Sequence, residues 1–206
     1  MRQVYICIDL KSFFASVECV ERGLDPMTAK LVVADPTRTE KTICLAVSPA
    51  LRALGVKNRC RVFEIPPRLE YIMAQPRMAL YIQYSARIYS IYLRYFSPED
   101  IHVYSIDEVF IDVSRYLAEQ RKTPRELVKT LLRDIKAETG LVATCGIGSN
   151  LYLAKIALDI ISKHAPDFIG ELDETSYREK LWDHRPITDF WRVSRGTSAR
   201  LASLGI

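Results

Sequence analysis

Short apolar runs of strand length alternate along this chain with segments of helical periodicity. Residues 4–8 (VYICI) form the first such run, and residues 101–113 (IHVYSIDEVFIDV) hold two more around an acidic turn. Residues 80–96 and 127–135 repeat apolar side chains at intervals of three and four, as helices packed on one face do. Another apolar run follows at residues 141–147. This order predicts an α+β fold in which helices cover one face of a mainly antiparallel sheet.

Local chemistry marks both ends of the helix that contains residues 127–135. Thr123 and Glu126 form a T-x-x-E capping box, Pro124 fits the first helical position, and Gly140 ends the helix. We also expect helices at residues 13–20 and 151–161 and short strands at 31–34 and 43–47. Prolines gather between residues 26 and 76, which indicates a small, loop-rich subdomain.

Composition is that of an ordinary folded protein. Apolar residues make up 49% and charged residues 26%, and the net charge is +4, which suits a nucleic-acid partner without requiring one. Five cysteines are spread without a C-x-x-C pair, and no signal peptide precedes the first apolar run. These features indicate reduced thiols in a cytoplasmic protein. The apolar runs are shorter than the roughly 18 residues that a membrane span needs, so we expect no membrane association.

Three carboxylates lie where a sheet could bring them together. Asp9 follows the first apolar run, and Asp107 and Glu108 lie between two later runs. Clustered carboxylates repel one another, and divalent cations such as Mg²⁺ relieve that repulsion. Two such ions about 4 Å apart can activate a hydroxyl and stabilise a leaving group. The residues alone leave open the alternative of an acidic turn near an unrelated strand end.

Three motifs in order resemble those of the Y family of error-prone, lesion-bypassing DNA polymerases. YSIDEVFID (104–112) resembles the family's S-I-D-E signature, DLKSFFASVE (9–18) its first motif, and GIGSNLYLAKIALDI (146–160) the segment that follows. SPALRALGV and FEIP are similar to the UmuC-type branch of SOS-like damage responses. The resemblance implies a ferredoxin-like antiparallel palm sheet, a small loop-rich fingers subdomain and a small helical thumb.

The resemblance also implies roles for individual residues. Asp9, Asp107, Glu108 and the Leu10 carbonyl would bind two Mg²⁺ ions, with Mn²⁺ as a substitute, and the three carboxylates would be catalytic. Phe14 would be the steric gate that excludes a 2′-hydroxyl. The residues expected to bind the deoxynucleoside triphosphate are Phe13, Phe14, Arg52 and Lys163.

Several positions depart from the family's pattern. Ala46 and Pro49 stand where threonine and tyrosine are common, so the triphosphate would have fewer hydrogen-bond donors. The family's phosphate-binding lysine aligns without gaps to Ser162, and one inserted residue would restore Lys163, which we favour. Lys155 is interpreted as a structural or surface lysine of its helix.

The C-terminal residues 189–206 resemble the helix-hairpin-helix of the family's thumb. Arg192, Val193 and Ser194 replace its Gly-x-Gly hairpin, so DNA phosphates would be contacted by Arg192 and Arg195 instead. The implied divisions are a first palm strand at 1–10, fingers at 11–77, the rest of the palm at 78–166 and a truncated thumb at 167–206. We expect a fragment that lacks the family's last domain, is weakly active alone, binds primer-template DNA, and reaches a sliding clamp or accessory subunit through the missing region.

Two other functions are weighed against polymerisation. A nucleotide cyclase with a palm-like fold would carry a glycine-rich acidic turn and no aromatic gate, unlike this chain. A catalytically weak palm-derived module that binds DNA and partners is consistent with the reduced set of triphosphate donors, although all three carboxylates are present.

Overall fold

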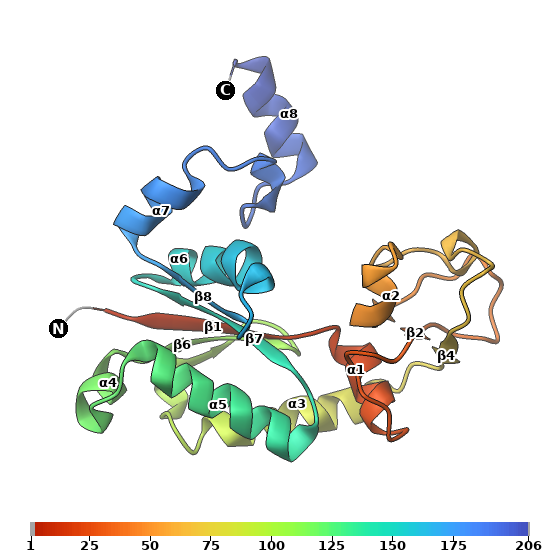
Figure 1. Ribbon diagram of the computed structural model, residues 1–206, viewed down its shortest axis with the longest axis horizontal. Coiled ribbons are helices and arrows are strands. Elements are labelled where there is room, and N and C mark those ends of the chain that lie inside the picture. The colour runs from red at the N-terminus through yellow and green to blue at the C-terminus, as the bar shows by residue number, and fades with distance from the viewer. Residues whose placement is uncertain (1–2, 206) are drawn as a thin grey trace. The chain divides into compact units, whose positions relative to one another are not determined.

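The computed structural model describes residues 3–205 (Figure 1), and the chain divides into two compact units. The first unit contains residues 1–9, 96–131 and 144–206, and the second contains residues 10–95 and 132–143.

The first unit is built on a sheet whose strands are far apart in sequence. Within residues 3–205 the sheet has five strands in the order β5-β6-β1-β7-β8. The pairs β1–β6 and β5–β6 are antiparallel, whereas β7–β8 is parallel. The strands are β1 (Tyr5–Leu10), β5 (Ile101–Val103), β6 (Glu108–Asp112), β7 (Ala143–Gly148) and β8 (Ile169–Leu172). The prediction of an α+β fold with a mainly antiparallel sheet is therefore confirmed.

Helices lie on both faces of this sheet (Figure 1). Helix α5 (Pro124–Thr139) lies on one face, and α4 (Ser114–Gln120) precedes it. Helix α6 (Leu151–Ile156) lies on the other face. It reaches the strands because the glycines beneath it have no side chain: a Cβ on Gly146 would lie 2.0 Å from the Ala154 carbonyl oxygen. The predicted single helical layer thus gains a second, smaller one.

The local chemistry of α5 agrees with its sequence. The Thr123 amide donates to Glu126 Oε2 at 2.9 Å, and the Glu126 amide donates to Thr123 Oγ1 at 3.3 Å, which completes the predicted capping box. The apolar face of α5 is fully buried at Leu127, Leu131 and Ile135. Gly140 follows the helix with φ +72°, a conformation that costs glycine little.

The second unit contains helices packed against a small sheet. Helix α1 (Phe13–Val20) contacts α3 (Met78–Tyr92) and the strands β2 and β3. The sheet order is β3-β2-β4, from β2 (Leu31–Val33), β3 (Ala46–Val47) and β4 (Ile72–Ala74), and β2 pairs with β4 in parallel. Helix α2 (Pro49–Ala53) and a 3₁₀ turn (Val62–Glu64) complete it. Its core includes Val32, Val47 and Leu51.

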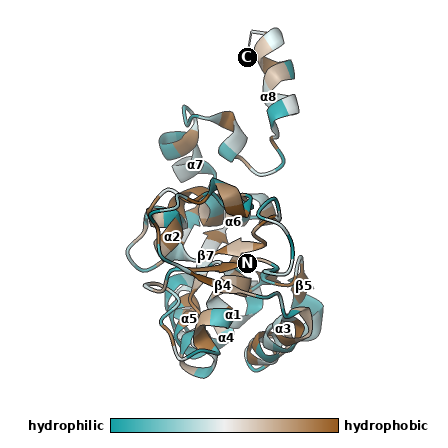
Figure 2. Ribbon diagram, turned by 90° about the vertical axis from the view of Figure 1, so that its right-hand side faces the viewer, coloured by the Kyte–Doolittle hydropathy of each residue, from teal (hydrophilic) through white to brown (hydrophobic). Residues whose placement is uncertain are grey.

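The C-terminal part begins with an extra strand. β8 extends the sheet, and α7 (Glu174–Leu181) and α8 (Arg195–Ser203) follow, with a 3₁₀ turn (Ile187–Asp189) between them. A cluster that includes Ile156, Leu172, Leu181 and Phe190 joins this part to α6. Figure 2 shows that the strands under α6 are among the more hydrophobic parts of the ribbon. The domain boundaries at residues 10, 77 and 166 stay a prediction.

All five cysteines are free and buried. None of the helices within residues 3–205 combines the length and the apolar character that crossing a bilayer would require.

Candidate active site

Strand register places Asp9 beside Glu108. β1 pairs with β6 so that Cys7 faces Phe110 and Asp9 faces Glu108. Directly opposed residues of an antiparallel pair project from the same face of the sheet, with Cβ atoms about 5 Å apart. The expectation that Asp9 lies beside the 107–108 turn is therefore met by backbone pairing alone.

Asp107 completes this group from the turn between β5 and β6. The turn is closed by the Tyr104 and Ser105 amides, which donate to the Glu108 carbonyl oxygen at 3.0 and 3.1 Å. The Ser105 hydroxyl donates to Asp107 Oδ1 at 2.8 Å. Burial raises the pKa of Asp9 to about 7, and the negative charges of Asp107 and Glu108 contribute to the increase. The three carboxylates thus repel one another, as their positions in the sequence suggested.

Lys155 was missed as a member of this site. Its Nζ lies 2.9 Å from Glu108 Oε1 and 3.1 Å from Asp159 Oδ1, and its side chain is only 9% exposed. Of the two interpretations given for Lys155, the surface lysine is wrong, because α6 lies directly on the sheet, whereas the buried ion pairs agree with a structural lysine. The spacing of Lys155 and Asp159, which favours an i,i+4 ion pair, was a sequence signal for a paired lysine.

The oxygen atoms of Asp9, Asp107 and Glu108 are chemically suited to divalent cations, although within the described residues the three side chains do not converge on a single point. Carboxylate and carbonyl oxygens are the ligands that Mg²⁺ prefers, and the mutual repulsion around Asp9 is what a cation would relieve. Within the described residues, however, no group of three or more His, Cys, Asp or Glu side chains is placed to hold a metal ion. Glu108 is instead paired with the Lys155 ammonium. The metal ligands stay a prediction.

The predicted gate residue lies in the second unit. Phe14 stacks on Tyr81 with ring centroids 4.4 Å apart and an interplanar angle of 15°. Phe13 is buried beside it, at 5.6 Å between centroids. Ser12, just before α1, has φ +48°, and its carbonyl oxygen accepts a hydrogen bond from the Ser16 amide. Phe14 is thus held on a short helix and its ring is stacked on Tyr81, and its role as a gate stays a prediction.

Two residues of the predicted triphosphate site lie on exposed surfaces. Arg52 is exposed on α2, and the Ser48 carbonyl accepts its backbone amide at 3.0 Å. Lys163 is exposed in the 3₁₀ turn Ser162–His164, whereas Ser162 is buried and donates its hydroxyl to the Leu158 carbonyl at 2.7 Å. Ser162 therefore cannot offer its side chain to a phosphate.

A π-helical segment directly precedes Ser162 and Lys163. After α6 the helix continues as a π-helix over Ala157–Ile161. A π-bulge accommodates one extra residue in a helix, and it is often found at functional sites. One extra residue at this place is consistent with the favoured Lys163. The choice of Lys163 over Ser162 and its phosphate contact both stay predictions.

The altered hairpin keeps a glycine-like backbone. Arg192 has φ +68°, in the region that glycine adopts readily, and its guanidinium carbon lies 4.8 Å from the Trp191 ring centroid. Trp191 contacts the rings of Tyr104, Phe110 and Tyr152. Arg192 and Arg195 are both exposed, so their side chains are free to contact phosphates.

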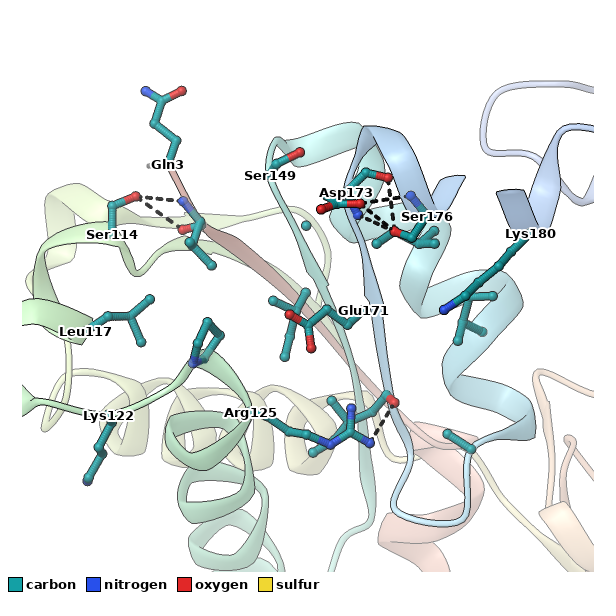
Figure 3. Close-up of a pocket in the computed structure, with 18 of the residues that line it drawn as sticks. Gln3, Ser114, Leu117, Lys122, Arg125, Ser149, Glu171, Asp173, Ser176 and Lys180 are labelled. Atoms are coloured by element: carbon teal, nitrogen blue, oxygen red, sulfur yellow. Dashed lines mark hydrogen bonds between the residues drawn. The ribbon is translucent and has the colours of Figure 1, made fainter. Parts of the chain in front are cut away.

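A separate cavity lies at the other end of the sheet (Figure 3). Its volume is about 970 Å³, and its lining includes Val4, Gly148 and Leu172. Figure 3 shows Lys122, Arg125, Glu171 and Lys180 around it, with the Arg125 guanidinium donating to the Ile169 carbonyl oxygen. None of the predicted site residues lines this cavity.

The fold matches that of Y-family DNA polymerases. A solved Y-family DNA polymerase chimera superposes on this chain with a TM-score of 0.83 and 25% sequence identity. The match covers 98% of this chain and 58% of that chain. The predicted palm-type architecture is therefore confirmed.

Sequence comparison gives the family. The impB/mucB/samB family matches residues 8–159, so the chain belongs to that family. A putative UV-damage repair protein, UvrX, from Bacillus subtilis is 35% identical over all of this chain and 48% of UvrX. DNA polymerase IV 2 from Halalkalibacterium halodurans is 33% identical over all of this chain and 49% of that polymerase. The chain spans about half the length of these two relatives.

Proposed function

We propose that the chain carries the catalytic palm and fingers of a template-directed DNA polymerase of the error-prone, lesion-bypass type. It would add deoxynucleotides to a primer 3′ end during DNA damage tolerance. The observation that carries the proposal is the pairing of Asp9 with Glu108 beside Asp107, where burial and the charges of Asp107 and Glu108 together raise the pKa of Asp9 to about 7. Family membership and the names of the relatives support the same activity.

The three carboxylates and the Leu10 carbonyl would hold two Mg²⁺ ions, with Mn²⁺ as a substitute. Such ions lower the pKa of an attacking hydroxyl and neutralise charge on the leaving pyrophosphate. The contribution of the chain is to fix the carboxylates: β1 and β6 hold Asp9 and Glu108 in register, and the Ser105 hydroxyl orients Asp107.

The family resemblance supplies the proposed nucleotide contacts. The Phe14 ring, supported by Tyr81, would exclude a 2′-hydroxyl, and the amides of Phe13 and Phe14 at the start of α1 would face phosphate oxygens. Arg52 and Lys163 would add positive charge. Arg192 and Arg195 would contact the DNA backbone in a salt-sensitive manner. We further propose a cytoplasmic location and a sliding clamp or accessory subunit as partner.

A second function, a DNA- and partner-binding module with little polymerase activity, is favoured by one observation. Ala46 in β3 and Pro49 at the first position of α2 provide no side-chain donor for a triphosphate. If the protein binds DNA without synthesising it, the three carboxylates have no catalytic role.

Primer extension by the natural protein that contains this chain separates the two. Asp107→Asn keeps the size of the side chain and removes its charge. We expect extension with Mg²⁺ to fall by about 100-fold or more, because a charged group that acts in the transition state is lost. The exposed carboxylate Asp183→Asn is the matched control and should extend normally. Equal extension by the parent and Asp107→Asn would remove the catalytic assignment.

A further inference from the structure

A buried ammonium faces the proposed metal ligands. Lys155 Nζ lies 2.9 Å from Glu108 Oε1, and that same oxygen also accepts the Cys7 thiol at 3.4 Å. The second partner of Lys155 is Asp159, one helical turn further along the chain. Both Lys155 and Glu108 are nearly inaccessible to solvent, with side chains 9% and 11% exposed.

Close contact between the backbones of α6 and β7 fixes the position of the Lys155 backbone. Gly146 and Gly148 let α6 lie on β7, since a Cβ on Gly148 would come within 2.2 Å of the Ala154 amide nitrogen. Ala154 and Leu158 pack with Cys7 and Phe110 on the face from which Asp9 and Glu108 project. Lys155 therefore has little freedom to move its backbone away from Glu108, and only its flexible side chain can adjust.

The local charges are unbalanced in the metal-free protein. The charges of Asp107, Glu108 and Asp159 act on Asp9 at this face, and the Lys155 ammonium acts on Asp9, Glu108 and Asp159. A buried carboxylate without a counter-charge is strongly unfavourable. The Lys155 ammonium forms an ion pair with Glu108 and so supplies positive charge to this carboxylate.

We infer that Lys155 is a positioning residue that holds Glu108 in the metal-free protein and competes with the incoming cation for that carboxylate. This inference rests on the proposed function, because it takes Glu108 to be a metal ligand. A cation and an ammonium on one carboxylate oxygen repel each other, so metal entry shifts Lys155 towards Asp159. Lys155 thus keeps the acidic face folded between catalytic cycles and weakens metal binding.

Mn²⁺ titration of the 206-residue chain, followed by electron paramagnetic resonance, tests the competition directly. In Lys155→Met the competing charge is lost while the length of the side chain is kept. We expect Mn²⁺ to bind about tenfold more tightly than to the parent, a typical size for coupling between two binding events. Lys155→Arg keeps the charge and should bind Mn²⁺ as the parent does.

Thermal unfolding of the same variants gives an independent readout. Without metal, Lys155→Met should unfold at a lower temperature than the parent, and saturating Mn²⁺ should raise its midpoint by more than it raises the parent's. Lys129→Met, which removes an exposed lysine of α5, controls for net charge and should change neither quantity. If Lys155→Met does not fold, Lys155→Gln replaces it.

The outcomes separate this inference from the proposed function. If the parent binds Mn²⁺, Asp107→Asn does not, and Lys155→Met binds no more tightly than the parent, the competition is disproved while the metal site stands. An equal loss of stability with and without Mn²⁺ would likewise show a purely structural lysine. If neither the parent nor Asp107→Asn binds Mn²⁺, the metal site and this inference fail together.

Discussion

Two carboxylates, the fully buried Glu18 of one compact unit and the half-buried Asp9 of the other, have opposite electrostatic surroundings. Glu18 in α1 is fully buried, yet Arg77 binds both of its oxygens, at 3.0 and 2.8 Å, and the Tyr81 hydroxyl donates at 2.8 Å. Arg22 adds a further ion pair. Burial alone would raise the pKa of Glu18, but hydrogen bonds from Arg77, Arg22 and Tyr81 outweigh it and lower the pKa.

Asp9 has the reverse balance. Burial and the charges of Asp107 and Glu108 together raise its pKa to about 7, although the charge of Lys155 lowers it in part. Glu18, which has a structural role, is thus paired with cationic and hydroxyl side chains of the same unit. The group of carboxylates around Asp9 keeps excess negative charge, which is the state that a cation-dependent site requires before its cation binds.

The largest effect on this contrast should come from breaking the paired carboxylate. Arg77→Met leaves Glu18 buried without its two-point partner, so the free energy of unfolding should fall by about 2–4 kcal/mol. Urea denaturation measures the loss. Arg38→Met removes an exposed ion pair with Asp35 in the same unit and should cost under about 1 kcal/mol. Similar losses in the two variants would show that the Glu18 network contributes little.

The unpaired carboxylate should behave oppositely when it is neutralised. The raised pKa of Asp9 means that the folded state binds more protons than the unfolded state between about pH 4 and pH 7. The stability of the metal-free parent therefore decreases as pH rises through this window. Asp9→Asn should remove that decrease and be more stable than the parent by about 1–3 kcal/mol at pH 8.

Denaturation of the metal-free proteins at pH 5 and pH 8 provides this comparison. The exposed Asp183→Asn should follow the parent at both pH values. A parent whose stability rises towards pH 8 to the same extent as that of Asp9→Asn would contradict the repulsion. Glu18 predicts the other sign, since its lowered pKa makes its contribution decline as the pH falls.

The smallest loss of stability is expected from a change at Tyr81, whose hydroxyl bonds to Glu18 and whose ring stacks on Phe14. Tyr81→Phe removes the hydroxyl that donates to Glu18 but keeps the ring stacked on Phe14. The loss of one hydrogen bond of four should cost about 1 kcal/mol in urea denaturation. A loss as large as that of Arg77→Met would mean that the tyrosine, not the arginine, dominates the network.

Local signals in the sequence predicted the elements well. The capping box at Thr123 and Glu126 and the stop at Gly140 give α5 its ends because they act within a few residues. Alternation and β-branched runs likewise predicted β1, β6 and β7. The parallel partners β4 and β8 were missed, because short strands stabilised by distant partners carry little local signal.

The site shows the same division. The motif residues Asp9, Asp107 and Glu108 could be identified from the sequence, but Lys155 could not be placed among them, since its burial depends on α6 lying against the glycines of β7. The burial of Ser162 and the exposure of Lys163 after the π-helical segment likewise depend on packing that the sequence does not reveal.

The sequence by itself determined the family, most of the strands and helices and the acidic residues of the candidate site, because these depend on local pattern and motif. Only the tertiary structure decided which charges face one another. Register set Asp9 opposite Glu108, and helix packing added the Lys155 ammonium. The physical reason is that the pKa and the pairing of a buried group depend on neighbours that are distant in the chain, and only folding brings those neighbours within a few ångströms.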